Sequence, residues 1–169
     1  MNINHTAAAA LGALTLISCV TEKEDDIWSL EPGDPCPHFS VTLTDGTELT
    51  TASLEGKHSM IVFFDTSCPD CREELPVIQA VYERTLEAEA NTAVICISRG
   101  EPEESVLPYW HTHGFTVPCS AQPDRTVYNM FASSVIPRIY TVGPSLTITH
   151  AFSDSPLPSE SELLASLGL

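Results

Sequence analysis

Two cysteines stand where a buried strand gives way to a helix, and this junction constrains the fold of the 169-residue chain more than any other feature. Met60-Ile61-Val62-Phe63-Phe64 is a continuous apolar run, which predicts a strand buried on both faces. Cys68-Pro69-Asp70-Cys71 follows, and we expect a helix from Pro69, a residue suited to a helix start. The order of strand, cysteine pair and helix indicates an α/β domain.

The other apolar runs and turn residues extend this pattern. We expect a hairpin across Phe39–Thr51 with an Asp45-Gly46 turn, and a second hairpin from Arg138 to Phe152 that turns at Gly143-Pro144. Further elements are expected as a strand over 92–97 and helices over 102–113 (interrupted at Pro108), 124–132 and 160–167. These elements predict a mixed central sheet flanked by helices, with an extra N-terminal β-hairpin.

The charge balance narrows the function classes. The chain has 7 Lys+Arg against 23 Asp+Glu, a net charge of −16 at pH 7, and 43% hydrophobic residues. That hydrophobic fraction is typical of a folded chain. A protein this acidic lacks the basic surface that nucleic acid or anionic lipid would require.

The N-terminus is expected to be a targeting signal. Residues 1–18 contain no charged side chain, and the apolar run from Ala7 is shorter than the roughly 18–20 residues of a spanning helix. Leu16-Ile17-Ser18-Cys19 resembles a bacterial lipobox, which implies lipid on Cys19, although Met1–His5 lacks the usual Lys or Arg. A buried helix or a misassigned start is the alternative. Val20 is not the Asp of inner-membrane retention, which favours the outer membrane, and surface exposure is a further option.

We therefore divide the chain into a lipoprotein signal peptide (1–18), an acidic flexible tether (19–31) and one domain (32–169). Cleavage before Cys19 would place the domain outside the cytosol, where thiols meet oxidising conditions.

The cysteine spacing predicts thiol chemistry. The unpaired N–H groups of a helix start stabilise a thiolate, so Cys68 is the expected nucleophile and Cys71 the resolving thiol of a redox-active disulfide. A zinc site would need two further ligands, and the sequence offers no second C-x2-C, so we expect no metal. A purely structural disulfide remains an alternative.

The segment Phe63–Pro76 resembles the active site of thioredoxin-like proteins, above all the membrane-tethered TlpA/ResA type. The resemblance extends from Gly33 to the end of the chain. It implies a thioredoxin-like fold in which Pro137 forms a cis bond beside the dithiol. The Ile136 backbone would then be exposed there for pairing with a substrate polypeptide.

Five positions carry further expectations from the resemblance. Pro69 takes the first place between the cysteines, where TlpA/ResA members often have proline second, and we expect it to contact substrate. Val62 occupies the place of the buried Asp of thioredoxin, so Cys71 needs another proton acceptor. Glu101 aligns with a glutamate that ResA-type proteins keep near the dithiol, and it is the candidate acid/base, with a surface-loop carboxylate as the alternative. Arg138 and Arg72 are both expected near the dithiol, and Arg138 is expected to contact substrate.

These features predict a cofactor-free thiol-disulfide oxidoreductase of the cell envelope, acting as a reductase. The resemblance implies protein disulfides as substrates, including those of apocytochrome c, and an upstream membrane electron donor. Two alternatives stay open. One is a redox-inactive binding lipoprotein, and the other is a peroxiredoxin, although Ile61 and Asp65 stand where that class needs Pro and Thr or Ser. Cys36 and Cys119 could pair, and Cys96 is expected to be a buried apolar residue.

Overall fold

The structure, a computed structural model, describes residues 27–169. The expected signal peptide and the lipidation site Cys19 lie outside the described residues. Among residues 27–169, no helix is long and apolar enough to cross a bilayer.

A five-stranded mixed sheet forms the centre of the fold, with the strand order β5-β4-β3-β6-β7. Strand β3 (His58–Phe64) lies in the middle, parallel to β4 (Thr92–Ser98) and antiparallel to β6 (Arg138–Val142). The edges are β5 (Cys119–Ser120) and β7 (Ile148–Phe152). All but the first residue of β3 are buried, as the continuous apolar run predicted.

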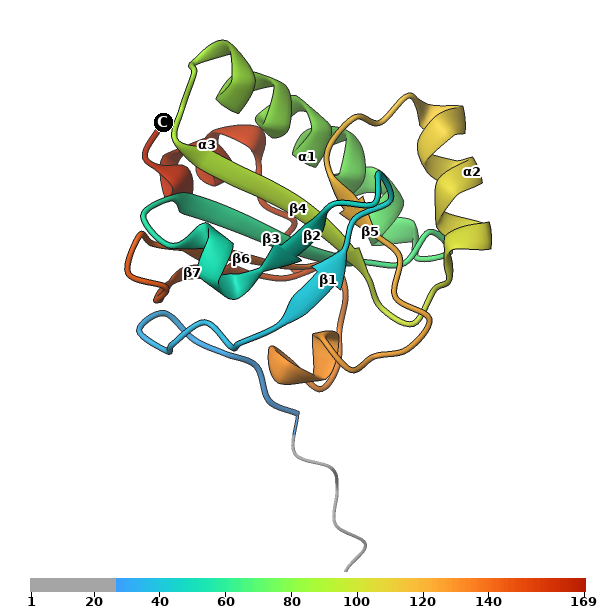
Figure 1. Cartoon of the computed structure of the whole chain (residues 1–169), viewed down its shortest axis with the longest axis horizontal. Helices are drawn as coiled ribbons and strands as arrows, with labels where there is room; N and C mark the ends of the chain where they lie inside the picture. Colours follow the sequence, from blue (N-terminus) through green and yellow to red (C-terminus); the bar gives the residue numbers. More distant parts are fainter. Residues whose placement is uncertain (1–26) are drawn as a thin grey trace, which may run out of the picture.

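Helices and aromatic side chains cover this sheet. Helix α1 (Pro69–Glu87) packs beside α3 (Glu160–Leu167), and α2 (Glu103–His113) lies near the β5 edge (Figure 1). The Phe63 ring lies within 5.4 Å of Tyr128, centroid to centroid, and 5.0 Å of Phe131. Tyr128 belongs to the 3-10 turn η2 (Tyr128–Met130), so η2 covers the carboxyl end of β3.

The N-terminal hairpin is confirmed. Strands β1 (Ser40–Thr42) and β2 (Glu48–Thr50) pair antiparallel, and the 3-10 turn η1 (Thr51–Leu54) leads into β3. The domain boundary at residue 32 differs from the structure, because the backbone is already held at 28–30. Leu30 N–H donates to the Phe131 carbonyl at 2.8 Å, and Ser133 N–H donates to the Trp28 carbonyl at 2.9 Å. The expected flexible tether therefore ends earlier than 31.

Two helix predictions were wrong in detail. The segment 124–132 holds only η2, because the Asp124 carboxylate accepts the Thr126 N–H at 2.8 Å and forms a turn in place of a helix start. Helix α2 passes through Pro108 without interruption. Pro108 is exposed, so the carbonyl that loses its partner faces solvent, while buried Val106 and Trp110 hold the helix on the domain.

Candidate active site

The two cysteines of the junction occupy different environments. Cys68 is the N-cap of α1, partly exposed, and its Sγ accepts the Cys71 N–H at 3.4 Å. Cys71 is completely buried, and burial, followed by the neighbouring Cys68, raises the pKa of its thiol. Both are free thiols. The Cys68 sulfur can thus be reached by a partner from solvent and is stabilised by an N–H donor. The Cys71 sulfur is shielded from solvent.

The cis-proline loop faces the nucleophile. The Ile136-Pro137 bond is cis, as the resemblance implied, and the Cys68 thiol lies 3.7 Å from the Ile136 carbonyl oxygen. Val135 has a φ of 71°, an unfavourable backbone conformation for a β-branched residue. The Tyr128 hydroxyl donates to the Val135 carbonyl at 2.7 Å and so anchors this loop to η2.

The turn between β3 and α1 is held by side chains on both sides. Both carboxylate oxygens of Glu101 accept from Thr66, one from its N–H at 2.8 Å and the other from its hydroxyl. Arg72 Nε donates to the Thr66 carbonyl at 2.5 Å. Among the described residues, no hydrogen bond joins Glu101 to either cysteine sulfur, so its contacts are those of a residue that positions the turn.

Sequence reasoning missed Glu74. This side chain is 2% exposed, and its Oε1 has no hydrogen-bond partner among residues 27–169. Burial, and secondly the charge of Glu73, raises the pKa of Glu74 to about 7. Glu74 follows Cys71 by three residues on α1, a spacing that puts the two side chains on one face. The signal was a carboxylate on the apolar stripe of the helix.

Val62 is buried in β3 and offers no proton acceptor, as expected from its apolar side chain. Glu74, on the same helix face as Cys71, is instead a buried carboxyl whose pKa is raised to about 7.

The other described cysteines are buried free thiols. Cys96 and Cys119 lie directly opposite each other on β4 and β5, and burial raises the pKa of both. Burial also raises the pKa of Cys36 to about 11, and its thiol lies 3.8 Å from the Pro37 carbonyl. The structure does not pair Cys36 with Cys119.

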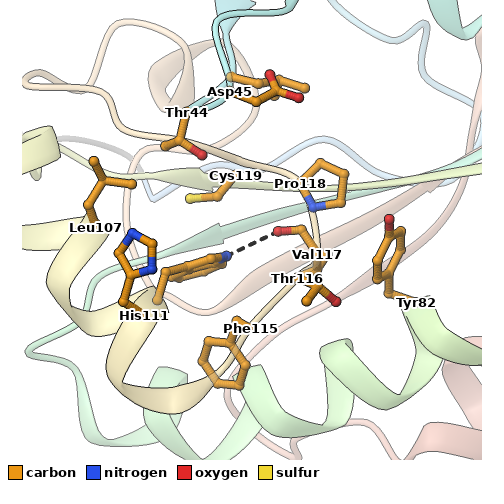
Figure 2. Close-up of a pocket in the computed structure, with 12 residues that line it drawn as sticks. Thr44, Asp45, Tyr82, Leu107, His111, Phe115, Thr116, Val117, Pro118 and Cys119 are labelled. Atoms are coloured by element: carbon orange, nitrogen blue, oxygen red, sulfur yellow. Dashed lines mark hydrogen bonds between the residues drawn. The ribbon is translucent and has the colours of Figure 1, made fainter.

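A pocket of about 300 Å³ lies between α2, β5 and the loop after β1 (Figure 2). Trp110 lines this pocket and donates its indole N–H to the Val117 carbonyl at 3.0 Å. None of the twelve lining residues belongs to the dithiol turn or to the cis-proline loop. The dithiol is thus not part of this pocket. Within residues 27–169, no cluster of three or more His, Cys, Asp or Glu could hold a metal ion.

The expected site residues assemble only in part. Cys68, Cys71, Ile136 and Pro137 meet at the carboxyl end of β3, with Pro69 exposed at the first position of α1. Arg138 starts β6 two residues after Ile136 and pairs with Phe63. Glu101 contacts the turn rather than the sulfurs.

A dithiol at a helix start, facing a cis-proline loop at the end of a central strand, defines a thioredoxin-like protein. The sequence profile of the AhpC/TSA family matches residues 32–151. The chain belongs to this family.

The most similar curated proteins include two thiol-disulfide oxidoreductases named ResA. The Bacillus subtilis protein is 23% identical over 116 residues, which cover 69% of this chain and 64% of that protein. The Geobacillus kaustophilus protein is 24% identical over 134 residues, covering 79% of this chain and 74% of that protein. The chain thus spans somewhat less than two thirds of the Bacillus subtilis relative.

Solved structures agree on the fold. A candidate protein disulfide isomerase from Bacteroides thetaiotaomicron superimposes with a TM-score of 0.74 and 29% identity, covering 83% of this chain and 92% of that one. A thiol:disulfide interchange protein from Chlorobium tepidum gives a TM-score of 0.68 at 24% identity, covering 83% and 97%.

Proposed function

We propose that this protein is a thiol-disulfide oxidoreductase that reduces disulfides in other polypeptides. The observation that carries the proposal is the asymmetry of the dithiol: Cys68 is partly exposed and accepts a helix N–H at 3.4 Å, while Cys71 is buried behind it. An exchange reaction needs one accessible thiolate and one thiol protected from unrelated disulfides. The names of the ResA relatives support the same reaction class.

The reaction proceeds through two exchanges. The Cys68 thiolate attacks one sulfur of the substrate disulfide, and the other substrate sulfur leaves as a thiolate and takes up a proton. Cys71, once deprotonated, attacks the Cys68 sulfur of the mixed disulfide, which releases the second substrate thiol. The protein ends as the Cys68–Cys71 disulfide, and two electrons have passed to the substrate.

Cys71 must lose its proton in the second exchange, and we assign the acceptor role to Glu74. Its carboxyl lies on the same helix face and, with a pKa of about 7, exchanges protons near neutral pH. Glu101 acts through Thr66 as a positioning residue, because both of its carboxylate oxygens hold the turn that precedes Cys68. Ile136 offers its backbone to the substrate strand beside Cys68.

The proposal includes a direction and a location. We assign the protein to the cell envelope, anchored through lipid on Cys19, where a membrane electron donor restores the dithiol. The lipobox resemblance at 16–19 and the oxidoreductase names of the relatives support this assignment. Candidate substrates are envelope polypeptides with a disulfide, apocytochrome c among them.

The reduction potential of the Cys68–Cys71 couple tests the direction. Equilibration with glutathione buffers, followed by mass spectrometry of alkylated protein, should give a value below about −200 mV, on the reducing side of known strong oxidants. The matched control is Cys68→Ser, which forms no such couple. A potential near −120 mV, typical of a strong oxidant, contradicts the reductase direction. A dithiol that reduces no peptide disulfide contradicts the activity itself.

The location has its own test. Expression of the full chain in a bacterium, with mass spectrometry of the mature N-terminus, should find a lipid-modified Cys19. Cys19→Ser should release the protein from the membrane fraction. An intact Met1 in the mature protein contradicts the anchor and leaves the redox proposal unaffected.

A further inference from the structure

The arginines of this acidic chain are unevenly placed. Arg84, on α1 far from the dithiol, forms ion pairs with Glu87 at 2.9 Å and Glu160 at 3.5 Å. The four other arginines have no carboxylate within ion-pair distance among residues 27–169: Arg72, Arg99, Arg125 and Arg138. In a chain of net charge −16, unpaired cations gathered in one region indicate a specific use.

Three of these four lie near the carboxyl end of β3, and we call Arg99, Arg125 and Arg138 the arginine cluster. The Arg99 guanidinium carbon lies 5.2 Å from the centre of the Tyr128 ring. Burial raises the pKa of Tyr128, while the charges of all three arginines oppose that rise. Arg125 packs over Gly100, with its Cγ 3.4 Å from the position that a Cβ would take there.

The cluster flanks the strand that leads to the dithiol. Arg138 lies opposite Phe63 in the β3–β6 ladder. The backbone N–H of Arg99 donates to the Phe64 carbonyl at 2.8 Å. Tyr128, at the centre of the cluster, bonds through its hydroxyl to the Val135 carbonyl. The next carbonyl along the chain, that of Ile136, faces the Cys68 sulfur. A polypeptide that pairs beside Cys68 would therefore pass next to the cluster.

The nearby carboxylates are bonded to other groups. Asp65 accepts from the Ser67 N–H at 2.7 Å and the Ser67 hydroxyl at 2.6 Å. Glu101 accepts from Thr66, and Asp124 accepts from the Thr126 N–H at 2.8 Å. The Nε atoms of Arg99 and Arg138 are buried and have no hydrogen-bond partner among the described residues. The two side chains are half-buried, and a partly desolvated guanidinium binds a partner's carboxylate more strongly than a fully exposed one does.

We propose that the substrate is a polypeptide with carboxylates beside its disulfide, recognised by Arg99, Arg125 and Arg138. The inference rests on the proposed reductase function and adds its substrate class. Guanidinium groups bind carboxylates through paired hydrogen bonds, and charges at the rim of a docking site select the partner. The net charge of −16 repels acidic chains at a distance, so the local cluster has to supply the preference.

Two disulfide peptides that differ only in charge test this inference. Each carries one internal disulfide flanked by four residues, all Glu in one peptide and all Gln in the other, and the reduced full chain acts on both. The overall charge of the protein also affects the two rates. We therefore compare the ratio of kcat/KM on the Glu peptide to kcat/KM on the Gln peptide between the wild-type protein and each variant. Arg99→Gln with Arg138→Gln should lower that ratio about tenfold, because the rate on the Glu peptide falls further than the rate on the Gln peptide.

The control variant removes two positive charges at positions away from the dithiol. Lys57→Gln with Arg84→Gln has the same net charge as the cluster variant, and it should leave the Glu-to-Gln ratio within about twofold of wild type. Arg99→Lys with Arg138→Lys should restore part of the preference, because the charge returns without the paired hydrogen bonds. Arg125→Gln concerns an exposed side chain, so it tests the cluster even if the variants of the half-buried Arg99 and Arg138 fail to fold.

The outcomes separate the two proposals. Equal losses on both peptides, or an equal fall in the ratio for Lys57→Gln with Arg84→Gln, would overturn the substrate inference. If Arg125→Gln folds and leaves the ratio unchanged while the variants of Arg99 and Arg138 unfold, the cluster has a structural role and the inference fails. If the wild-type protein reduces neither peptide, the reductase function fails instead.

Discussion

Two pairs of cysteines are brought together by the backbone of this protein, and their surroundings differ. Cys68 and Cys71 share the first turn of α1, where one thiol reaches solvent and accepts an N–H. Cys96 and Cys119 lie directly opposite each other on β4 and β5, with exposed fractions of 0% and 1%. All four are free thiols, so the oxidation state does not distinguish the pairs.

Two thiols that lie close together are therefore not necessarily reactive. A thiol attacks as its thiolate, which needs N–H donors or positive charge and a path for the partner disulfide. The helix start gives Cys68 both, while the sheet gives Cys96 and Cys119 only an apolar interior that raises the pKa of their thiols. The strand pair therefore acts as small apolar packing residues, and only the helix pair supports exchange.

Loss of the nucleophile is the sharpest way to test this contrast. Cys68→Ser should lower the rate of disulfide-peptide reduction by at least about a thousandfold, because serine has no sulfur with which to form the mixed disulfide. The rate of disulfide-peptide reduction by Cys119→Ala should stay within about twofold of the wild-type rate. Comparable losses from the two variants would show that the buried pair takes part in the reaction.

Thiol accessibility measures the same difference without turnover. In the native reduced protein, iodoacetamide should modify Cys68 at least about a hundredfold faster than Cys96 or Cys119, because a buried thiol reacts only after local opening. Peptide mass mapping over time gives the individual rates. In concentrated urea the three rates should converge, and rapid native labelling of Cys96 would contradict the packing role.

The reactive pair could be found from sequence because its signal is local. The apolar run of β3, the Cys68–Cys71 spacing and Pro69 at the first helical position lie within one short segment, and each restricts the backbone. The fold class follows from the same alternation of strands and helices. The partner loop with Pro137 was reached only through family resemblance, since nothing local connects residue 137 to residue 68.

The rest of the site depends on tertiary contacts that have no local pattern. Glu101 meets Thr66 because β4 runs parallel to β3 and ends beside it, a contact that no local pattern around residue 101 indicates. The cluster around Tyr128 joins residues from three separate segments. Glu74 could have been noticed on the apolar stripe of α1, but its missing hydrogen-bond partner is visible only in the packed domain.

Glu74 is a buried carboxyl on the helix of the reactive pair. Its ionisation should make the free energy of unfolding depend on pH. Its pKa is raised from 4.5 to about 7, so the native state holds a proton that the unfolded chain has lost between those values. Stability then falls as pH rises from about 4.5 to 7, and Glu74→Gln removes that fall. Above pH 7 the variant should be more stable than wild type by at most about 3 kcal/mol, measured by urea unfolding.

The exposed neighbour Glu73 supplies the control for this pH dependence. Glu73→Gln should change the stability by less than about 0.5 kcal/mol and keep most of the fall with pH. The rate of the second exchange should drop only in Glu74→Gln, by about a hundredfold if the carboxyl accepts the Cys71 proton. A pH-independent difference between Glu74→Gln and wild type would contradict the raised pKa.

The smallest effect is expected in the strand pair, where the thiols serve as packing. Cys96→Ala should reduce the free energy of unfolding by about 1 kcal/mol, because it removes one buried sulfur and leaves a small cavity. Cys96→Ser keeps nearly the same volume but buries a hydroxyl without an assured partner, so it should cost about 1–3 kcal/mol. Both variants should retain wild-type rates of disulfide reduction. If Cys96 serves only as an apolar packing residue, Cys96→Ser should be less stable than Cys96→Ala, and both should keep wild-type activity. A serine variant as stable as wild type would mean that the site tolerates a polar group, and the contrast between the two cysteine pairs would then rest on accessibility alone.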